Sequence, residues 1–332
     1  MVLHPAIIAL LVGSLLISCM LIYSSYYGLR IIRNWDIKSG SESQLGLEQR
    51  TYLISTLMSY ALGFQLLSLF LFIYTADNLS TLFVGAMCAA GSLNANEWGY
   101  PTIVMKVLDF ILAGLWIIVN FADNRAYDYP LIKKKYGLLL IITPFILAET
   151  AVQVLYFAGL EPDIITSCCG TLFTTGAEGA TASIVALPRT PVEVAFYSSM
   201  ILTFALGVAF YMKERAAYLF SISSLVTFFI SIAALISFIS LYFYELPTHH
   251  CPFCILQKEY GYVGYALYLT FLGGAVFGLG VGVTMPFRNI ESLRAVLPRI
   301  QRQLTLISLG SYALFMAIVA YGILFSNLRL SG

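Results

Sequence analysis

The chain has 332 residues, of which 59% are hydrophobic and only 11% are charged, and its mean hydropathy is +0.85. This is more apolar surface than a water-soluble core of the same length can bury, so the composition excludes a soluble globular protein. The formal net charge of +1 gives no sign of a nucleic-acid partner.

Apolar runs of about 20 residues recur along the whole length, and each is long enough to cross about 30 Å of hydrocarbon as a helix. We therefore predict an all-α polytopic membrane protein with eight transmembrane helices. The predicted spans are about 6–30, 51–75, 101–122, 137–160, 194–212, 217–243, 262–285 and 304–326.

The basic residues predict the orientation of these helices. Most of the 18 lysines and arginines fall in alternate connections, and the positive-inside rule places those connections in the cytoplasm. Both termini and the remaining connections then face outward, which suits the inner membrane of a bacterium. The cytoplasmic set is Arg30, Arg33, Lys38, Arg50, Arg125, Lys133, Lys134, Lys135, Lys213, Arg215, Arg288, Arg294, Arg299 and Arg302, against Lys106, Arg189, Lys258 and Arg329 on or near the other side. The inner loops are basic and amphipathic, so membrane lipid is their expected partner.

Five of the six cysteines lie in the predicted outer connections: Cys88, Cys168, Cys169, Cys251 and Cys254. An outer face is where disulfides form and persist, so this gathering favours redox chemistry or metal binding. Stapling of loops is the alternative, but an odd number of cysteines and an adjacent Cys168-Cys169 pair fit it poorly. The sixth cysteine, Cys19, falls inside the first predicted helix.

The stretch "THHCPFCILQK", from Thr248 to Lys258, combines a Cys-x-x-Cys pair with two histidines. We expect Cys251 and Cys254 at the start of the seventh helix, where the helix N-terminus and nearby cations would lower the thiol pKa values. The cations are His249, His250 and Lys258.

An internal repeat relates this stretch to an earlier one. "CAAGSLNANEWGY" (88–100) aligns with "CPFCILQKEYGY" (251–262) when one inserted residue is allowed, and Gly91 stands in place of the second cysteine. Each copy lies between the second and third helices of a four-helix half. We predict two tandem halves, 1–160 and 194–332, joined by an outer segment, 161–193, that carries Cys168 and Cys169.

The sequence Cys251-Pro-Phe-Cys254-Ile-Leu-Gln-Lys258 resembles the signature of the DsbB family of quinone-linked membrane thiol oxidases, and more loosely the wider vitamin K epoxide reductase group. The resemblance implies that Cys251 and Cys254 pass electrons to a quinone, with Lys258, and Gln257 before it, beside that quinone. Lys258 stands where the family has arginine, which keeps the charge and loses the planar fork. The family's second cysteine pair has no counterpart after the last helix, so a shuttle pair would come from Cys168 and Cys169 or from Cys88.

Membrane thiol-disulfide exchange is therefore the leading hypothesis, with a thiol protein or a cytochrome at the outer face as partner. The main alternative is a copper or zinc site formed by His249, His250, Cys251 and Cys254. A transporter is the third reading. Haem b is not expected, because no histidine lies deep within a predicted helix.

Charged residues inside the predicted helices are few. Lys106 and Asp109, three apart, are expected to pair with each other. Glu149 has no evident partner in the sequence and is a candidate proton relay for quinone chemistry, or else a neutral carboxyl within the bundle.

Overall fold

A computed structural model describes residues 3–37, 39–161, 165–166 and 188–328. Within these residues the chain is helical, with one isolated bridge between Val84 and Ile165 as the sole strand-like pairing. Eight helices in the described part of the chain are long and apolar enough to cross a membrane. The prediction of an all-α polytopic membrane protein is confirmed.

The membrane helices follow the predicted spans. They are α1 (Pro5–Asn34), α2 (Glu42–Leu79, extended by a 3-10 turn to Leu82), α4 (Gly99–Asp123), α5 (Ile132–Ala158), α8 (Arg189–Lys213), α9 (Ala217–Ala234, continued by a π segment, Leu235–Ile239, and by α10, Ser240–Tyr244), α11 (Val263–Thr284, extended by a 3-10 turn to Phe287) and α12 (Leu297–Phe325).

Helices α2 and α12 begin earlier than predicted, at Glu42 and Leu297. Hydropathy marks only the part of a helix that lies in hydrocarbon, whereas the polar turns that precede it also satisfy their own backbone hydrogen bonds. The polar first turns of both helices therefore lengthen them beyond the apolar run.

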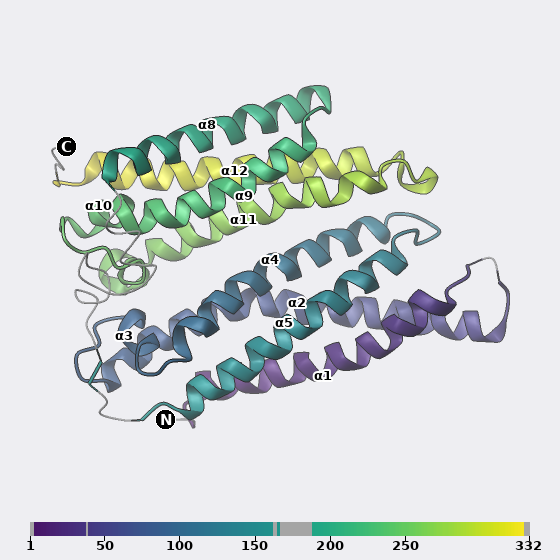
Figure 1. The fold of residues 1–332 in the computed structure, drawn as a ribbon, viewed down its shortest axis with the longest axis horizontal. Coiled ribbons are helices and arrows are strands. Elements are labelled where there is room, and N and C mark those ends of the chain that lie inside the picture. Colours follow the sequence, from purple (N-terminus) through teal and green to yellow (C-terminus); the bar gives the residue numbers. More distant parts are fainter. Residues whose placement is uncertain (1–2, 38, 162–164, 167–187, 329–332) are drawn as a thin grey trace. The chain divides into compact units, whose positions relative to one another are not determined.

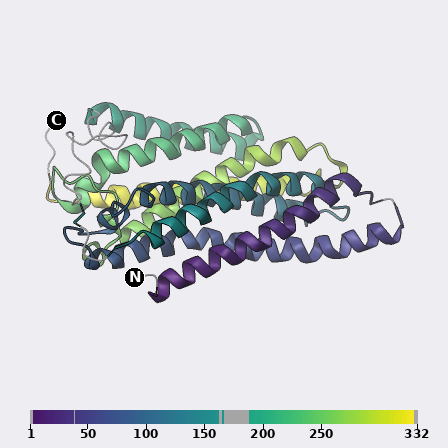
Figure 2. The same ribbon diagram turned by 60° about the horizontal axis from the view of Figure 1, so that its bottom comes forward.

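The chain divides into two compact units. The first comprises Met1–Phe72, Glu97–Leu160 and Val283–Gln301, and the second comprises Ile73–Asn96, Glu161–Gly282 and Arg302–Gly332. In the first unit α5 packs against both α1 and α4 (Figures 1 and 2). Its core includes Met58, Trp116, Tyr136 and Ile146.

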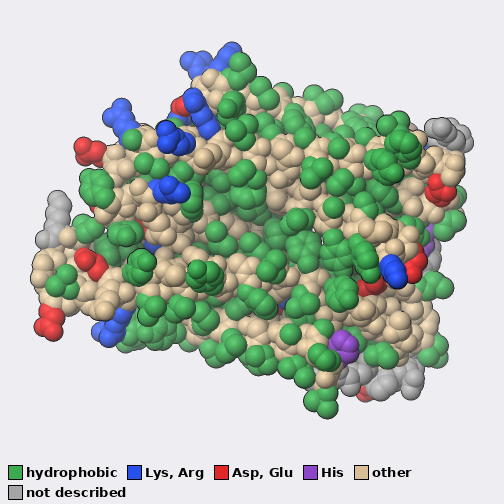
Figure 3. Space-filling model, turned by 180° about the vertical axis from the view of Figure 1, so that it is seen from behind, with side chains coloured by type: hydrophobic (Ala, Val, Ile, Leu, Met, Phe, Trp, Pro, Cys, Tyr) green, Lys and Arg blue, Asp and Glu red, His purple; other side chains and the backbone are tan. Residues whose placement is uncertain are grey.

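Small residues allow close helix packing in the second unit. Gly278 and Gly282 on α11 face Ser224 and Ser221 on α9, and there is no room there for a larger side chain. Membrane helices associate through such small residues because lipid supplies no hydrophobic force between them. Apolar side chains cover the exposed flanks of the helices instead (Figure 3), as expected of surfaces that contact lipid.

Candidate functional site: a buried three-cysteine cluster

Three cysteines from the two copies of the repeat meet within the second unit. Cys88 is the N-cap residue of the short helix α3 (Ala89–Leu93), Cys251 lies in the loop after α10, and Cys254 begins a 3-10 turn, Cys254–Leu256. Their three sulfur atoms all lie within 4.8 Å of one another, and the Sγ atoms of Cys88 and Cys251 are 3.6 Å apart. Cys254 is the most exposed of the three, at 5%.

Tyr244, at the end of α10, holds the Cys-x-x-Cys loop in place. Its hydroxyl donates a hydrogen bond to the carbonyl of Cys251 at 2.5 Å and accepts one from the amide of Ile255 at 2.8 Å. Tyr268 on α11 donates to the carbonyl of Pro252. These bonds satisfy backbone groups that a buried loop would otherwise leave without partners.

Asp77 and Gln257 connect the loops of the two copies. One Asp77 carboxylate oxygen accepts hydrogen bonds from the amide of Ala89 and from the Gln257 side chain, both at 3.1 Å. The same Gln257 nitrogen donates to the carbonyl of Met87 at 2.8 Å. Gln257, which the resemblance placed beside a quinone, therefore fixes the Cys88 loop against the Cys251 loop.

His249 lies beside the cluster. Its Nε2 atom is 3.3 Å from the sulfur of Cys254, and its ring packs edge-on against Tyr244. Burial lowers the pKa of His249 below its ordinary value of 6.5, an effect that Cys88 opposes and His250 reinforces. A neutral imidazole at this distance can take the proton of the Cys254 thiol and stabilise the thiolate.

His250 contacts the π segment that continues α9. Its Nδ1 atom lies 2.9 Å from the carbonyl oxygen of Ile236, in the π segment. A carbonyl oxygen can only accept, so Nδ1 carries the proton and donates. Sequence reasoning placed both histidines at the cysteines, and the structure brings one of them, His249, into contact with a sulfur.

The expected position of the cysteine pair at the start of the seventh membrane helix is wrong. Helix α11 begins at Val263, so Cys251 and Cys254 do not occupy its first turn. Gln257 is extended, and Gly261 and Tyr262 have positive φ values of 62° and 57°, which separate the cysteine turn from the helix. Lys258 is exposed, on the 3-10 turn Lys258–Tyr260. Stabilisation of the thiolate by the end of a long helix is therefore absent from this loop.

Lys106 pairs with Glu149 and not with Asp109. Its Nζ atom lies 2.7 Å from a Glu149 carboxylate oxygen, and both side chains belong to the first unit. The i, i+3 rule considers neighbours on one helix, whereas this pair joins α4 to α5. The remaining predicted site residues, Cys168 and Cys169, lie outside the described residues.

The structure explains why only the second copy of the repeat has a Cys-x-x-Cys pair. A Cβ atom on Gly91 would come within 2.7 Å of the Ala86 backbone, so no cysteine fits there without a shift of the loop. The local order of elements is otherwise alike in both copies: a cysteine, a short helical turn, and then a membrane helix at Gly99 or Val263. Superposition of the two halves stays a prediction.

No family model, curated protein or solved structure matches this chain. Sequence reasoning missed the contacts of Tyr244, at the end of α10, and of Asp77, near the end of α2, with the two cysteine loops. Both residues lie at predicted outer helix ends, next to the cysteine loops in the sequence, and this position could have indicated the contacts.

We expect the folded protein to lose stability as pH falls, through His249. Because burial lowers its pKa, the unfolded chain binds more protons than the folded chain once pH drops towards 6.5, and stability declines from there to the folded pKa. Thermal unfolding at about pH 7.5 and about pH 5.5 measures the effect. The His249→Gln variant should lose less stability between the two conditions than the unmodified protein. Equal losses would contradict the assignment.

Proposed function

We propose that this integral membrane protein is a thiol-disulfide oxidoreductase that passes electrons from thiols at the outer face of a bacterial inner membrane to a quinone. The observation that carries the proposal is the convergence of three buried thiols, with Cys88 and Cys251 in van der Waals contact. The outer location rests on the charge pattern of the loops, and the quinone on the resemblance of residues 251–258.

The chemistry begins with the Cys251-Cys254 dithiol. Its oxidation forms one S–S bond and releases two electrons and two protons, and a quinone that accepts them becomes a quinol. A substrate dithiol at the outer face then reduces the disulfide: its thiolate attacks one sulfur, a mixed disulfide forms, and its second thiol resolves it. Cys168 and Cys169 stay the predicted exchange pair at that face.

Cys88 adds an internal step. Its thiolate can attack the Cys251 sulfur of the oxidised pair, which forms a Cys88-Cys251 disulfide and expels Cys254 as a thiolate. The leaving sulfur is the one next to His249, at 3.3 Å. An imidazole at the leaving group supplies a proton or a favourable hydrogen bond, and thiolates that are stabilised in this way leave faster.

A thiolate metal site is the second candidate, and the His249 contact favours it. Three sulfurs and one imidazole nitrogen form a donor set that zinc or copper(I) prefers. Thiolates on one tetrahedral zinc, with bonds of about 2.3 Å, lie about 3.8 Å apart, close to the spacing of Cys88 and Cys251. Metal handling therefore uses the same residues.

One experiment separates the two candidates. The purified protein is denatured and labelled with a thiol reagent, with and without prior reduction, and its copper and zinc are measured in parallel. We expect labelling of Cys251 and Cys254 to require reduction after incubation with a short-chain quinone, and metal to be far below one equivalent. Stoichiometric metal, with thiols that in the folded protein label only after a chelator is added, would replace the redox proposal with the metal site.

A further inference from the structure

The membrane helices of the first unit bury two lysines, each in an ion pair. Lys135 on α5 lies 2.7 Å from Asp123 of α4, and Lys106 on α4 lies 2.7 Å from Glu149 of α5. All four side chains are at most 1% exposed. Burying an ionisable group within a membrane bundle costs free energy unless it is paired. The partners of each lysine therefore indicate its role.

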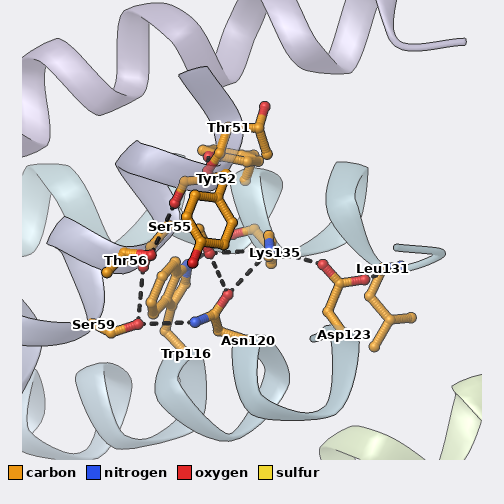
Figure 4. Close-up of polar contacts among 11 residues, drawn as sticks. Thr51, Tyr52, Ser55, Thr56, Ser59, Trp116, Asn120, Asp123, Leu131 and Lys135 are labelled. Carbon is orange, nitrogen blue, oxygen red and sulfur yellow. Dashed lines mark hydrogen bonds and ion pairs between the residues drawn. The ribbon is translucent and has the colours of Figure 1, made fainter. Parts of the chain in front are cut away.

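The Lys135 pair is fully satisfied (Figure 4). Besides Asp123, its ammonium group donates to Asn120 at 3.0 Å and to Ser55 at 3.2 Å. The other carboxylate oxygen of Asp123 accepts from the amide of Leu131 at 2.8 Å. Every proton of the ammonium group has an acceptor, which is typical of a pair that joins helices.

The Lys106 pair lies next to an additional acid. Glu149 accepts from Lys106 with one oxygen and from Gln65 with the other, at 3.1 Å. Lys106 also lies 3.4 Å from the hydroxyl of Ser68 and over the ring of Phe72. Asp109, on the same face of α4 as Lys106, is 1% exposed, and neither of its oxygens accepts a hydrogen bond from any described residue.

The charges do not balance if both acids are ionised. The charged groups that act on Asp109 are Lys106 on its own helix and Glu149 on α5, and no other described residue contributes a charge there. The positive charge of Lys106 is already matched by Glu149. A second carboxylate, buried without hydrogen-bond donors, would cost several kcal/mol, and such a group becomes neutral instead. The Gln65 amide oxygen beside Glu149 likewise accepts no hydrogen bond from the described residues, which leaves room for a donor.

We propose that Lys106, Asp109 and Glu149 form a proton-binding site within the membrane part of the first unit. In the observed state Asp109 holds the proton and Lys106 pairs with Glu149. In a second state the O–H bond of Asp109 breaks, a new O–H bond forms on Glu149, and Lys106 turns to Asp109, three residues along the same helix. The net charge is the same in both states. The states differ only in which carboxyl group holds the proton and in the rotamer of Lys106. This site is independent of the cysteine chemistry.

Infrared spectroscopy tests the proposal, because a protonated carboxylic acid has a carbonyl band that shifts in D₂O. We expect the purified protein to show this band at neutral pH and the Asp109→Asn variant to lose it. Lys106→Met should increase the band about two-fold, since Glu149 then also becomes neutral. The matched control is the double variant Asp123→Asn with Lys135→Met, which removes both charges of the other buried pair of α4 and α5 and should leave the band unchanged.

The opposite results would overturn the proposal. A band that survives in Asp109→Asn, or one that does not grow in Lys106→Met, would show that the proton is elsewhere. Since the two variants change the band in opposite directions, failure of either one to fold leaves the other decisive. Binding of sodium ions to the unmodified protein, lost in Asp109→Asn, would make the site a cation site and not a proton site.

Discussion

Replacing Cys254 with serine is expected to reduce quinone-dependent oxidation of a dithiol to the uncatalysed rate. Without the Cys254 thiol, Cys88, 3.6 Å away, is the one thiol among the described residues with which Cys251 can pair, and no third described thiol lies beside them to resolve that disulfide. The measurement is quinone reduction by a small dithiol, followed spectrophotometrically, together with reductant-dependent labelling of Cys88. The label should show a Cys88-Cys251 disulfide that accumulates in the variant.

The matched control is Cys19→Ser, because Cys19 is an exposed cysteine of α1 and no part of the cluster. Its activity should equal that of the unmodified protein. Full activity in Cys254→Ser would exclude a redox role for the pair. Loss of a bound metal without loss of a disulfide would favour the metal site.

The largest loss of stability is expected from Lys135→Met. This change removes the partner of the buried Asp123 carboxyl group, and breaking a buried ion pair costs about 3–5 kcal/mol. Asn120 and Ser55 also lose a donor. Thermal unfolding of the protein in detergent measures the effect as a lowered Tm.

A double variant provides the control for this prediction. In Lys135→Met with Asp123→Leu, both charges are replaced by apolar groups, so most of the stability should return. If the double variant is as unstable as the single one, packing around Lys135, and not its charge, holds α4 and α5 together.

The membrane helices could be predicted because hydrocarbon imposes one local requirement, a long apolar run whose backbone bonds are internal. The cysteine loops could not be predicted in the same way. Their form depends on contacts between distant segments, such as Gln257 and Asp77, which are 180 residues apart. The chemical character of the motif was readable from Cys251 and Cys254, but the lowered pKa of His249 and the exposure of Lys258 depend on which side chains the fold buries, and one sequence does not display that.

The buried ion pairs also show which features local sequence can predict and which depend on packing between helices. Spacing along one helix pointed to Lys106 with Asp109, and the structure pairs Lys106 with Glu149 across two helices. Local spacing identifies the groups that can meet on one helix, and packing decides which of them do. Asp109 therefore has no lysine partner among the described residues, and the proposed proton site is based on this acid.

The π segment Leu235–Ile239 determines the direction in which the side chains of the following helix, α10, point. Such a segment accommodates one extra residue in a helical path, and each residue turns an α-helix by about 100°. With that residue removed, Tyr244 would emerge on a different side of the helix, away from the backbone groups of Cys251 and Ile255 that it now joins. The geometry of the three thiols thus depends on a single widened turn, which only the short helix α10 separates from the loop that carries the first cysteine of the pair.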